Sequence, residues 1–265
     1  MELNGKVAVV TGGASGIGRA LAWRFADEGA KGVVVADLDG TGAEAVAGEI
    51  GRQAIGIACD VADPEQVRAL VARAEEAFGA VDLFCANAGV AIGLGLEESD
   101  DVWDKAFGIN IRGHITAARE LVPGWVERGE GYFLTTASAA GLLTQIGSAP
   151  YAVTKHAAVA FAEWLSVTYG DQGVRVSCLC PQGVNTPMLN AGLSDDDGTK
   201  AADVVRAAGN VIEPEQVADI VVEGLREERF LILPHPEVLT YFQRKGSDYD
   251  RWLAGMRRLQ AAIVG

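Results

Sequence analysis

Short runs of β-branched and other apolar residues alternate with longer amphipathic segments along the first 233 residues of the chain. This alternation is typical of βαβ units and predicts a doubly wound, Rossmann-like α/β fold with a parallel sheet. Because the runs are continuously apolar, we expect helices on both faces of the sheet. About seven strands are predicted, over residues 6–11, 32–37, 54–59, 81–86, 132–137, 174–179 and 229–233.

Two helices between these strands carry clear start signals. Asp63, Pro64 and Gln66 form a capping-box pattern, which predicts a helix over residues 64–78. A second Pro-Glu-Gln sequence begins at Pro214 and opens a segment with one apolar helical face. We expect both helices to pack on the sheet.

The chain has no internal repeat or linker, so residues 1–265 are predicted to form a single domain. Glycines and three successive aspartates interrupt the regular pattern over residues 187–212, which favours a mobile loop that covers the substrate. Residues 235–265 have an apolar stripe and a local excess of basic residues, and predict a C-terminal helical extension. That extension either contacts another subunit or covers an edge of its own domain.

The amino-acid composition disfavours several classes of binding partner. With 22 Lys+Arg against 36 Asp+Glu, the net charge is −14, which disfavours binding to nucleic acid and to anionic membrane surfaces. No apolar run approaches the roughly 20 residues of a membrane span. The first residues lack the basic and apolar regions of a secretory signal, so a cytoplasmic location is expected.

No metal site is expected. The cysteines lie in or beside apolar runs without zinc-binding spacing, which favours buried free thiols: Cys59, Cys85, Cys178 and Cys180. The scattered histidines are interpreted as structural: His114, His156 and His235. Asp195–Asp197 lack the alternating ligands of a calcium loop.

A glycine-rich loop follows the first predicted strand and opens a helix. Its glycines allow the backbone to approach a pyrophosphate at the helix N-terminus. The loop residues expected to contact the cofactor are Gly12, Ser15, Gly16, Ile17 and Gly18. Asp37 ends the second strand, nineteen residues beyond Gly18, where a carboxylate accepts hydrogen bonds from ribose hydroxyls.

Asp37 also indicates which dinucleotide is bound. Its charge repels a 2′-phosphate, and neither position 15 nor position 38 holds a Lys or Arg to offset that repulsion. NAD is therefore predicted in preference to NADP. The glycine spacing differs from that of nucleotide triphosphatases, which disfavours ATP hydrolysis.

A second set of polar residues suggests proton transfer. Tyr151 and Lys155 lie four residues apart, so on a helix they are neighbours, and the adjacent cation favours the phenolate. Tyr151 would then act as general acid/base, with Ser138 binding the same substrate oxygen. Taken alone, the Tyr-Lys pair is better explained as a structural pair on a helix surface. Its combination with the glycine loop favours catalysis.

Over nearly its whole length the sequence resembles the short-chain dehydrogenase/reductase family in its compact single-domain form. Beyond the glycine loop, the resemblance rests on Asp60-Val61, Asn87-Ala88-Gly89, Asn110, Ser138, Tyr151, Lys155 and the segment from Pro181 to Thr186. It implies a catalytic Ser-Tyr-Lys site completed by Asn110, which would hold a water for proton relay. It also implies a homotetramer or homodimer.

The resemblance further implies contacts with NAD. Asp60 and Val61 would touch the adenine, and Asn87, Ala88 and Gly89 would pass beside its ribose. Val184 and Thr186 would hold the nicotinamide carboxamide, while Lys155 and Tyr151 would lie at the nicotinamide ribose. Three alternatives stay open: Asn110 stabilises a helix kink, Asn87 bridges two strand ends, and Gly89 serves only a turn.

One departure from the family pattern concerns the substrate. The family usually has Pro-Gly-x-Val-x-Thr, whereas here Gln182 follows Pro181 and the glycine comes one place later. Gln182 either touches the substrate or points aside. Gln145 and Met188 are further candidate substrate contacts. The apolar residues of the loop 187–212 and of the segment after Ser138 favour a largely apolar substrate, and core packing explains several of them equally well.

These features predict an NAD-dependent oxidoreductase that transfers hydride between NAD and a secondary alcohol or its ketone. One alternative is an NADPH-dependent ketone or ketoacyl reductase, against which Asp37 argues. Another is a non-catalytic NAD-binding module, which retention of Ser138, Tyr151 and Lys155 disfavours.

Overall fold

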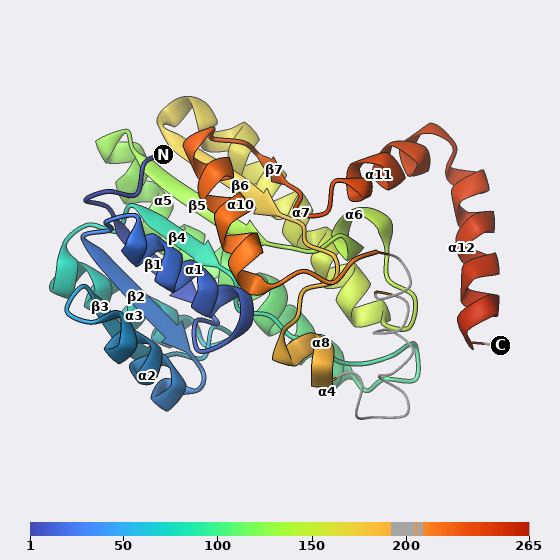
Figure 1. Ribbon diagram of the computed structural model, residues 1–265, viewed down its shortest axis with the longest axis horizontal. Coiled ribbons are helices and arrows are strands. Elements are labelled where there is room, and N and C mark those ends of the chain that lie inside the picture. The colour runs from blue at the N-terminus through green and yellow to red at the C-terminus, as the bar shows by residue number, and fades with distance from the viewer. Residues whose placement is uncertain (192–204, 206–208, 265) are drawn as a thin grey trace.

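A seven-stranded parallel sheet forms the centre of the protein (Figure 1). The computed structural model describes residues 1–191, 205 and 209–264. The strand order is β3-β2-β1-β4-β5-β6-β7, which confirms the predicted doubly wound fold. The strands are β1 (Val7–Thr11), β2 (Gly32–Asp37), β3 (Ala54–Ala58), β4 (Leu83–Ala86), β5 (Gly131–Thr136), β6 (Val174–Leu179) and β7 (Leu231–Ile232).

Helices cover both faces of this sheet (Figure 1). Side chains alternate along each strand, so Val7 and Val9 enter one apolar cluster while Ala8 and Val10 enter the other. The first cluster is completed by α3 (Pro64–Phe78), α5 (Gly113–Arg128) and α7 (Ala149–Tyr169). The second is completed by α1 (Gly16–Asp27), α2 (Gly40–Ile50) and α10 (Pro214–Arg226). Burial on both faces explains why the strands are continuously apolar.

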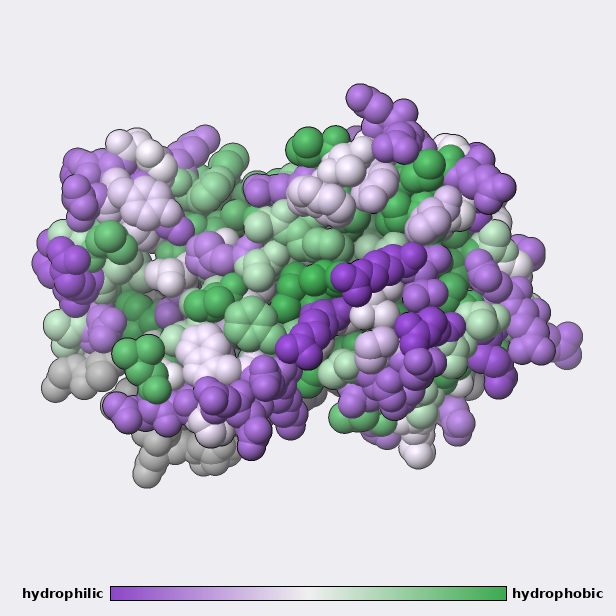
Figure 2. Space-filling view, turned by 180° about the vertical axis from the view of Figure 1, so that it is seen from behind, coloured by the Kyte–Doolittle hydropathy of each residue, from purple (hydrophilic) through white to green (hydrophobic). Residues whose placement is uncertain are grey.

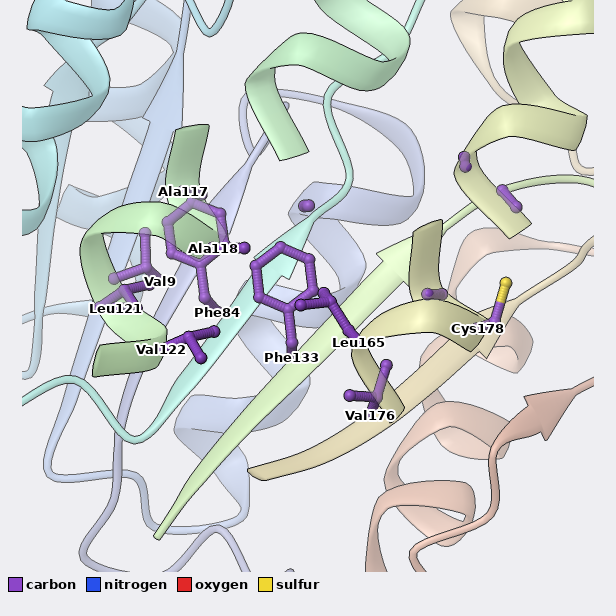
Figure 3. Packing of buried hydrophobic residues seen from close by; sticks show 14 of the residues in the cluster. Val9, Phe84, Ala117, Ala118, Leu121, Val122, Phe133, Leu165, Val176 and Cys178 are labelled. Atoms are coloured by element: carbon purple, nitrogen blue, oxygen red, sulfur yellow. The ribbon is translucent and has the colours of Figure 1, made fainter. Parts of the chain in front are cut away.

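Aromatic rings fix the two central strands β4 and β5. The rings of Phe84 and Phe133 stack with centroids 5.8 Å apart, and Trp125 of α5 meets Phe133 edge-on at 6.4 Å. Leu121 and Val122 lie beside these rings (Figure 3). Burying one such ring contributes about 1.5–3 kcal/mol. The packing holds the carboxyl ends of β4 and β5, where polar residues of the candidate site follow.

The predicted helix starts are present, with one difference. The Asp63 carboxylate accepts from the Glu65 N–H at 2.9 Å, but the Gln66 side chain accepts from the Asp60 N–H rather than from that of Asp63. The reciprocal capping box occurs instead at α10, between Glu213 and Gln216. Gln66 thus also fixes Asp60, at the end of the connection from β3.

The remaining helical segments lie around and beyond the site. They are α4 (Asp100–Phe107), a π-helical turn (Gly108–Arg112), α6 (Ala140–Leu143), a 3₁₀ turn (Gly170–Gln172), α8 (Pro187–Ala191), α11 (Glu237–Ser247) and α12 (Tyr249–Val264). Helices α11 and α12 extend away from the sheet beyond β7 (Figure 1). Of the predicted loop 187–212, residues 192–204 and 206–208, with Asp195–Asp197, lie outside the described residues.

The described part of the chain also bears on membrane and metal chemistry. It contains no helix long and apolar enough to cross a membrane. Nor does it contain a group of three His, Cys, Asp or Glu side chains placed to hold a metal ion. All four cysteines are buried and free of disulfide bonds.

Candidate active site

The predicted site residues follow the carboxyl ends of neighbouring strands. The glycine loop follows β1, Asn87 follows β4, Ser138 follows β5 and Pro181 follows β6. The strand order reverses direction between β1 and β4, and in such sheets ligands bind outside the carboxyl ends at this point. The topology therefore brings together segments that are far apart in the sequence.

Several glycines of the loop occupy positions where a side chain would not fit. Gly12 and Gly16 have φ angles of 65° and 52°, which non-glycine residues rarely adopt. A Cβ on Gly12 would lie 2.9 Å from Cα of Ala88. A Cβ on Gly18 would collide with the carbonyl oxygen of Gly12 and lie 2.7 Å from Nδ2 of Asn87. The loop is thus pressed against the segment that follows β4.

We expect Gly18→Ala to destabilise the fold by about 1–3 kcal/mol, because the added methyl group has no space. Chemical denaturation measures this change. Gly48→Ala is the matched control: Gly48 lies in α2 with nothing within 4 Å of its Cβ position. Its substitution should stabilise the helix by about 0.5–1 kcal/mol. Equal stability of the Gly18 variant and the wild type would contradict the close approach.

Asp37 lies beside the glycine loop. Its Oδ2 accepts from the Ala14 N–H and its Oδ1 from the Asp39 N–H, both at 3.0 Å. The adjacent Leu38 side chain is 74% exposed. Each carboxylate oxygen has further lone pairs, so the group can still accept bonds from ribose hydroxyls.

Asn87 bridges two strand ends. Its Nδ2 donates to the Thr11 carbonyl at 2.9 Å. The Thr11 hydroxyl accepts from the backbone N–H groups of Asn87 and Ala88, at 3.0 and 3.1 Å. Of the two interpretations from the sequence, the bridging one describes these contacts. The bridge fixes the loop after β4 to the start of the glycine loop.

Gly89 lies against two predicted catalytic residues. A Cβ at this position would lie 3.2 Å from both Nζ of Lys155 and Oδ1 of Asn110. Gly89 does not have a positive φ angle. Its small size therefore serves a close approach rather than only a turn.

Tyr151 and Lys155 are neighbours on α7, as the spacing predicts. Nζ of Lys155 lies 5.7 Å from the centroid of the Tyr151 ring and donates to the Thr136 carbonyl at 3.0 Å. Lys155 is only 3% exposed, and burial lowers its pKa to about 8. The lysine is thus a buried cation at the end of β5.

The pKa of the Tyr151 phenol is shifted in the opposite direction to the one expected from the sequence. Burial raises its pKa, and a hydrogen bond with the Ser138 hydroxyl opposes that rise. Desolvation of the phenolate therefore outweighs this hydrogen bond. Ser138 is itself buried, where its Oγ accepts from the Ala140 N–H at 3.1 Å. The structure thus brings Ser138, Tyr151 and Lys155 together.

Asn110 lies in the π-helical turn between α4 and α5. Its Oδ1 accepts from the Val90 N–H at 2.8 Å, and its Nδ2 donates to the Val90 carbonyl at 2.9 Å and to Oγ1 of Thr154 at 3.0 Å. Both amide hydrogens are thus used within the chain. The side chain joins the turn, the loop after β4 and α7. These contacts differ from the alternative considered from the sequence, in which Asn110 stabilises a helix kink by bonding helical carbonyls.

The segment from Pro181 to Thr186 meets the glycine loop. A Cβ on Gly16 would lie 3.0 Å from Cγ2 of Thr186. Val184 pairs with Ile212 in an isolated parallel bridge. The Gln182 side-chain oxygen is buried without a hydrogen-bond partner among the described residues.

The structure also places the remaining residues that the sequence predicts to contact the substrate or the cofactor. The Gln145 amide donates to the Ile146 carbonyl at 3.0 Å, and Met188 is an exposed residue of α8. Oδ1 of Asp60 accepts from the Ala62 N–H at 2.9 Å. Val61 lines a cavity of about 10 Å³ together with Ala88 and His114.

His114, at 2% exposure, has no hydrogen-bond partner for either ring nitrogen in the described structure. Burial, and secondarily the charge of Lys155, lowers its pKa to about 3. An unfolded histidine titrates near 6.5, so the unfolded chain binds more protons between these values. The stability associated with neutral His114 is therefore present above pH 6.5 and is lost as the pH falls toward 3.

We expect His114→Leu to remove this pH dependence. Because leucine has no titrating group, the wild-type stability relative to the variant should fall by about 2 kcal/mol between pH 7 and pH 5. Urea denaturation of both proteins at each pH measures the difference. Parallel stability curves would show that His114 is not held neutral by burial.

Known proteins with similar sequences belong to a family that agrees with this arrangement of residues. A family model described as short chain dehydrogenase matches residues 6–197. The chain belongs to the short-chain dehydrogenase/reductase family. As a member of this family it is an oxidoreductase, which agrees with the Ser138, Tyr151 and Lys155 cluster.

Two curated relatives in the short-chain dehydrogenase/reductase family are dehydrogenases. The 1-deoxy-11-beta-hydroxypentalenate dehydrogenase of Streptomyces exfoliatus is 38% identical over 89% of this chain and 86% of its own. The 2,5-dichloro-2,5-cyclohexadiene-1,4-diol dehydrogenase of Sphingobium indicum is 36% identical over 83% of this chain and 90% of its own.

A solved short-chain dehydrogenase/reductase supports the fold. The enzyme from Burkholderia phymatum, crystallised in complex with NAD, superposes with a TM-score of 0.86 at 33% identity. The match covers 94% of this chain and 96% of that structure. The agreement extends over the seven-stranded sheet and the helices around it.

The sequence does not predict a role for Lys245, a buried lysine of this short-chain dehydrogenase/reductase. Lys245 of α11 is 7% exposed, and its Nζ donates to the Leu142 carbonyl of α6 at 2.6 Å. It also lies 3.4 Å from Nε2 of His156, the residue after Lys155. The contact joins the C-terminal extension to both catalytic segments. In the sequence, Lys245 is one of several basic residues of an amphipathic tail, so no local signal distinguishes it.

Proposed function

We propose that the protein is an NAD-dependent dehydrogenase that transfers hydride between NAD and a secondary alcohol or its ketone. The observation that carries this proposal is the buried Lys155 beside Tyr151, with the Ser138 hydroxyl bonded to the same phenol. This proton-transfer group lies at the sheet edge that also presents the glycine loop.

The chain's residues fit NAD. The close contacts that Gly12, Gly16 and Gly18 allow fix the shape of the loop at the N-terminus of α1, where a pyrophosphate is stabilised. Asp37 would accept bonds from the adenosine ribose. The remaining contacts that we propose, from the family resemblance, are Ser15, Ile17, Asp60, Val61, Asn87, Ala88, Gly89, Tyr151, Lys155, Val184 and Thr186. When bound, NAD accepts or supplies the hydride.

Tyr151 acts as the general acid/base in this proposal. Its phenolate takes the proton of the alcohol as hydride leaves the carbon, and in the reverse direction the phenol returns it to the ketone. Ser138 donates a hydrogen bond to the reacting oxygen and fixes its position. Lys155 stabilises the phenolate, because with a pKa of about 8 it is largely charged at pH 7. Asn110 supports proton exchange by holding the turn beside Lys155.

The substrate class that we propose is a hydroxylated cyclic compound with a largely apolar skeleton. The names of the relatives describe dehydrogenation of a hydroxylated pentalenate and of a chlorinated cyclohexadiene diol. The segment after Ser138 supplies buried apolar residues, Leu142, Leu143 and Ile146. Gln182, with its unpartnered buried oxygen, is the polar residue best suited to orient such a substrate.

Formation of reduced nicotinamide tests the reaction. The protein is mixed with NAD and a panel of cyclic secondary alcohols, diols, steroids and hydroxyacyl compounds, and NADP replaces NAD in a parallel series. We expect turnover with NAD and a cyclic alcohol. NAD binding without turnover across the panel would favour a non-catalytic nucleotide-binding protein, and turnover only with NADP would overturn the choice of cofactor.

A homodimer or homotetramer is expected in solution. Hydrophobic residues gather near the middle of the rear face of the molecule, beside strongly hydrophilic side chains that cross it, and hydrophilic residues lie at both ends (Figure 2). Val153, Trp164 and Val167 of α7 are exposed, and contact with a second copy would bury them. Light scattering coupled to size-exclusion chromatography measures the mass. A mass of one chain, 27.7 kDa, at micromolar concentration would contradict this prediction.

A further inference from the structure

A buried histidine joins two segments that border the proposed nicotinamide site. His235 lies two residues before Glu237, where α11 begins, and is only 2% exposed. Its Nδ1 lies 3.1 Å from the backbone nitrogen of Gln182. Its Nε2 lies 3.1 Å from the carbonyl oxygens of both Gly183 and Asn210. All polar atoms of the imidazole are therefore in contact with backbone of these two segments.

These contacts define the protonation state of the ring. A backbone N–H can only donate, so Nδ1 must accept from Gln182. Carbonyl oxygens can only accept, so Nε2 must carry the proton and donate it to Gly183 and Asn210. His235 is thus a neutral imidazole in a single tautomer. Its hydrogen bonds are complete only when both segments are in place.

The two segments also pair with each other. The Ile212 N–H donates to the Gly183 carbonyl at 3.0 Å, and the Asn185 N–H donates to the Ile212 carbonyl at 2.9 Å. Val184 forms the isolated bridge with Ile212 between these bonds. The Asn185 amide also donates to the Glu213 carboxylate at 3.1 Å, at one end of this pairing. The imidazole adds its contacts at the other end, beside Gln182 and Gly183. Residues 182–185 lead directly to Thr186, which meets Gly16 of the glycine loop.

We propose that His235 is a positioning residue for the nicotinamide half of the cofactor site. The inference rests on the proposed function, because it takes Val184 and Thr186 as the residues that hold the carboxamide. Without the imidazole, the Gln182 N–H and the Asn210 carbonyl lose this partner in a partly buried environment. The buried Gly183 carbonyl keeps only the Ile212 N–H, so the segment is less firmly held. None of the hydrogen bonds of His235 in the described structure goes to the glycine loop or to Asp37, so the adenosine half should be unaffected.

Comparing NAD with ADP-ribose, which lacks the nicotinamide, separates this role from a general effect on folding. Calorimetric titration measures both dissociation constants for the wild type, His235→Leu and His235→Gln. We expect the leucine variant to bind NAD about tenfold more weakly, as loss of roughly 1.4 kcal/mol implies. Its affinity for ADP-ribose should stay within about twofold. Glutamine offers one acceptor and a donor, and should restore most of the NAD affinity.

Leu239→Ala is the matched control, because Leu239 is an exposed residue of α11 close in sequence to His235. It should leave both affinities unchanged. Equal weakening of NAD and ADP-ribose in His235→Leu would show a purely structural role, and no change in either would also overturn the inference. If the wild type itself bound no NAD, the proposed function would fail instead. Weakened NAD binding that glutamine does not restore would exclude the hydrogen bonds as its cause.

Discussion

Replacing Tyr151 by phenylalanine is expected to abolish turnover and to leave NAD binding nearly intact. The change removes one hydroxyl group, the proposed proton donor and acceptor, and keeps the ring on α7. Lys155 retains its bond to the Thr136 carbonyl, so the buried cation stays in place. General acid/base catalysis contributes about 10²–10⁴-fold, and the turnover number should fall by at least that factor. Formation of reduced nicotinamide measures the rate, and calorimetry measures NAD affinity.

Tyr169→Phe is the matched control for this loss. Tyr169 ends the same helix, where its ring meets Trp164 at 5.8 Å, and none of the described contacts links it to Ser138 or Lys155. The control variant should keep wild-type turnover. Activity retained by Tyr151→Phe would remove Tyr151 from its role as acid/base, whereas loss of NAD affinity in that variant would indicate a disturbed site.

The positions of the strands were accessible from the sequence because parallel strands buried on both faces must be apolar throughout. All seven predicted strands are present. The ends of the strands are harder to predict: the sequence predicts β7 over residues 229–233, but the strand spans only Leu231–Ile232. These two residues pair with Cys178 and Leu179 of β6. The end of a strand depends on which neighbour is available for pairing, and a local pattern does not contain that information.

The same distinction holds within the site. The glycine loop and the Tyr151–Lys155 pair have fixed local spacings, which makes them visible in one sequence. The contact of His235 with Gln182 joins residues 53 positions apart, and that of Lys245 with Leu142 joins residues 103 apart. Such contacts arise only after the helices have packed. No pattern around either residue marks them.

Burial also limits what spacing can predict about acidity. The neighbouring cation at Lys155 suggested a lowered pKa for Tyr151, yet burial raises it. Desolvation depends on how many atoms from distant segments surround the phenol, and this is a property of the packed structure. The hydrogen bond with Ser138 and the desolvation act on the phenol in opposite directions. The positive charge of bound NAD would add to the effect of Lys155, so we expect the catalytic acidity of Tyr151 to develop only with the cofactor present.

The combined substitution Asp37→Ala and Leu38→Arg is expected to reverse the cofactor preference from NAD to NADP. Asp37 places a negative charge at the end of β2, where the adenosine ribose would lie, and this charge repels a 2′-phosphate. Leu38 is 74% exposed, so an arginine there can extend toward that phosphate without repacking the core. Removal of the repulsion and gain of a charged pair should together change the ratio of kcat/KM for the two cofactors by about a hundredfold or more.

The single variants separate the two contributions. Leu38→Arg alone retains the carboxylate and should change the ratio far less than the pair, because the new cation lies beside Asp37. Asp37→Ala alone also removes the bond to the Ala14 N–H, so it should weaken NAD while relieving repulsion of NADP. Steady-state kinetics with each cofactor, at saturating substrate, gives the ratios. An unchanged ratio in the double variant would mean that Asp37 does not lie at the ribose, and the glycine loop would then have to select NAD without a carboxylate at the end of β2.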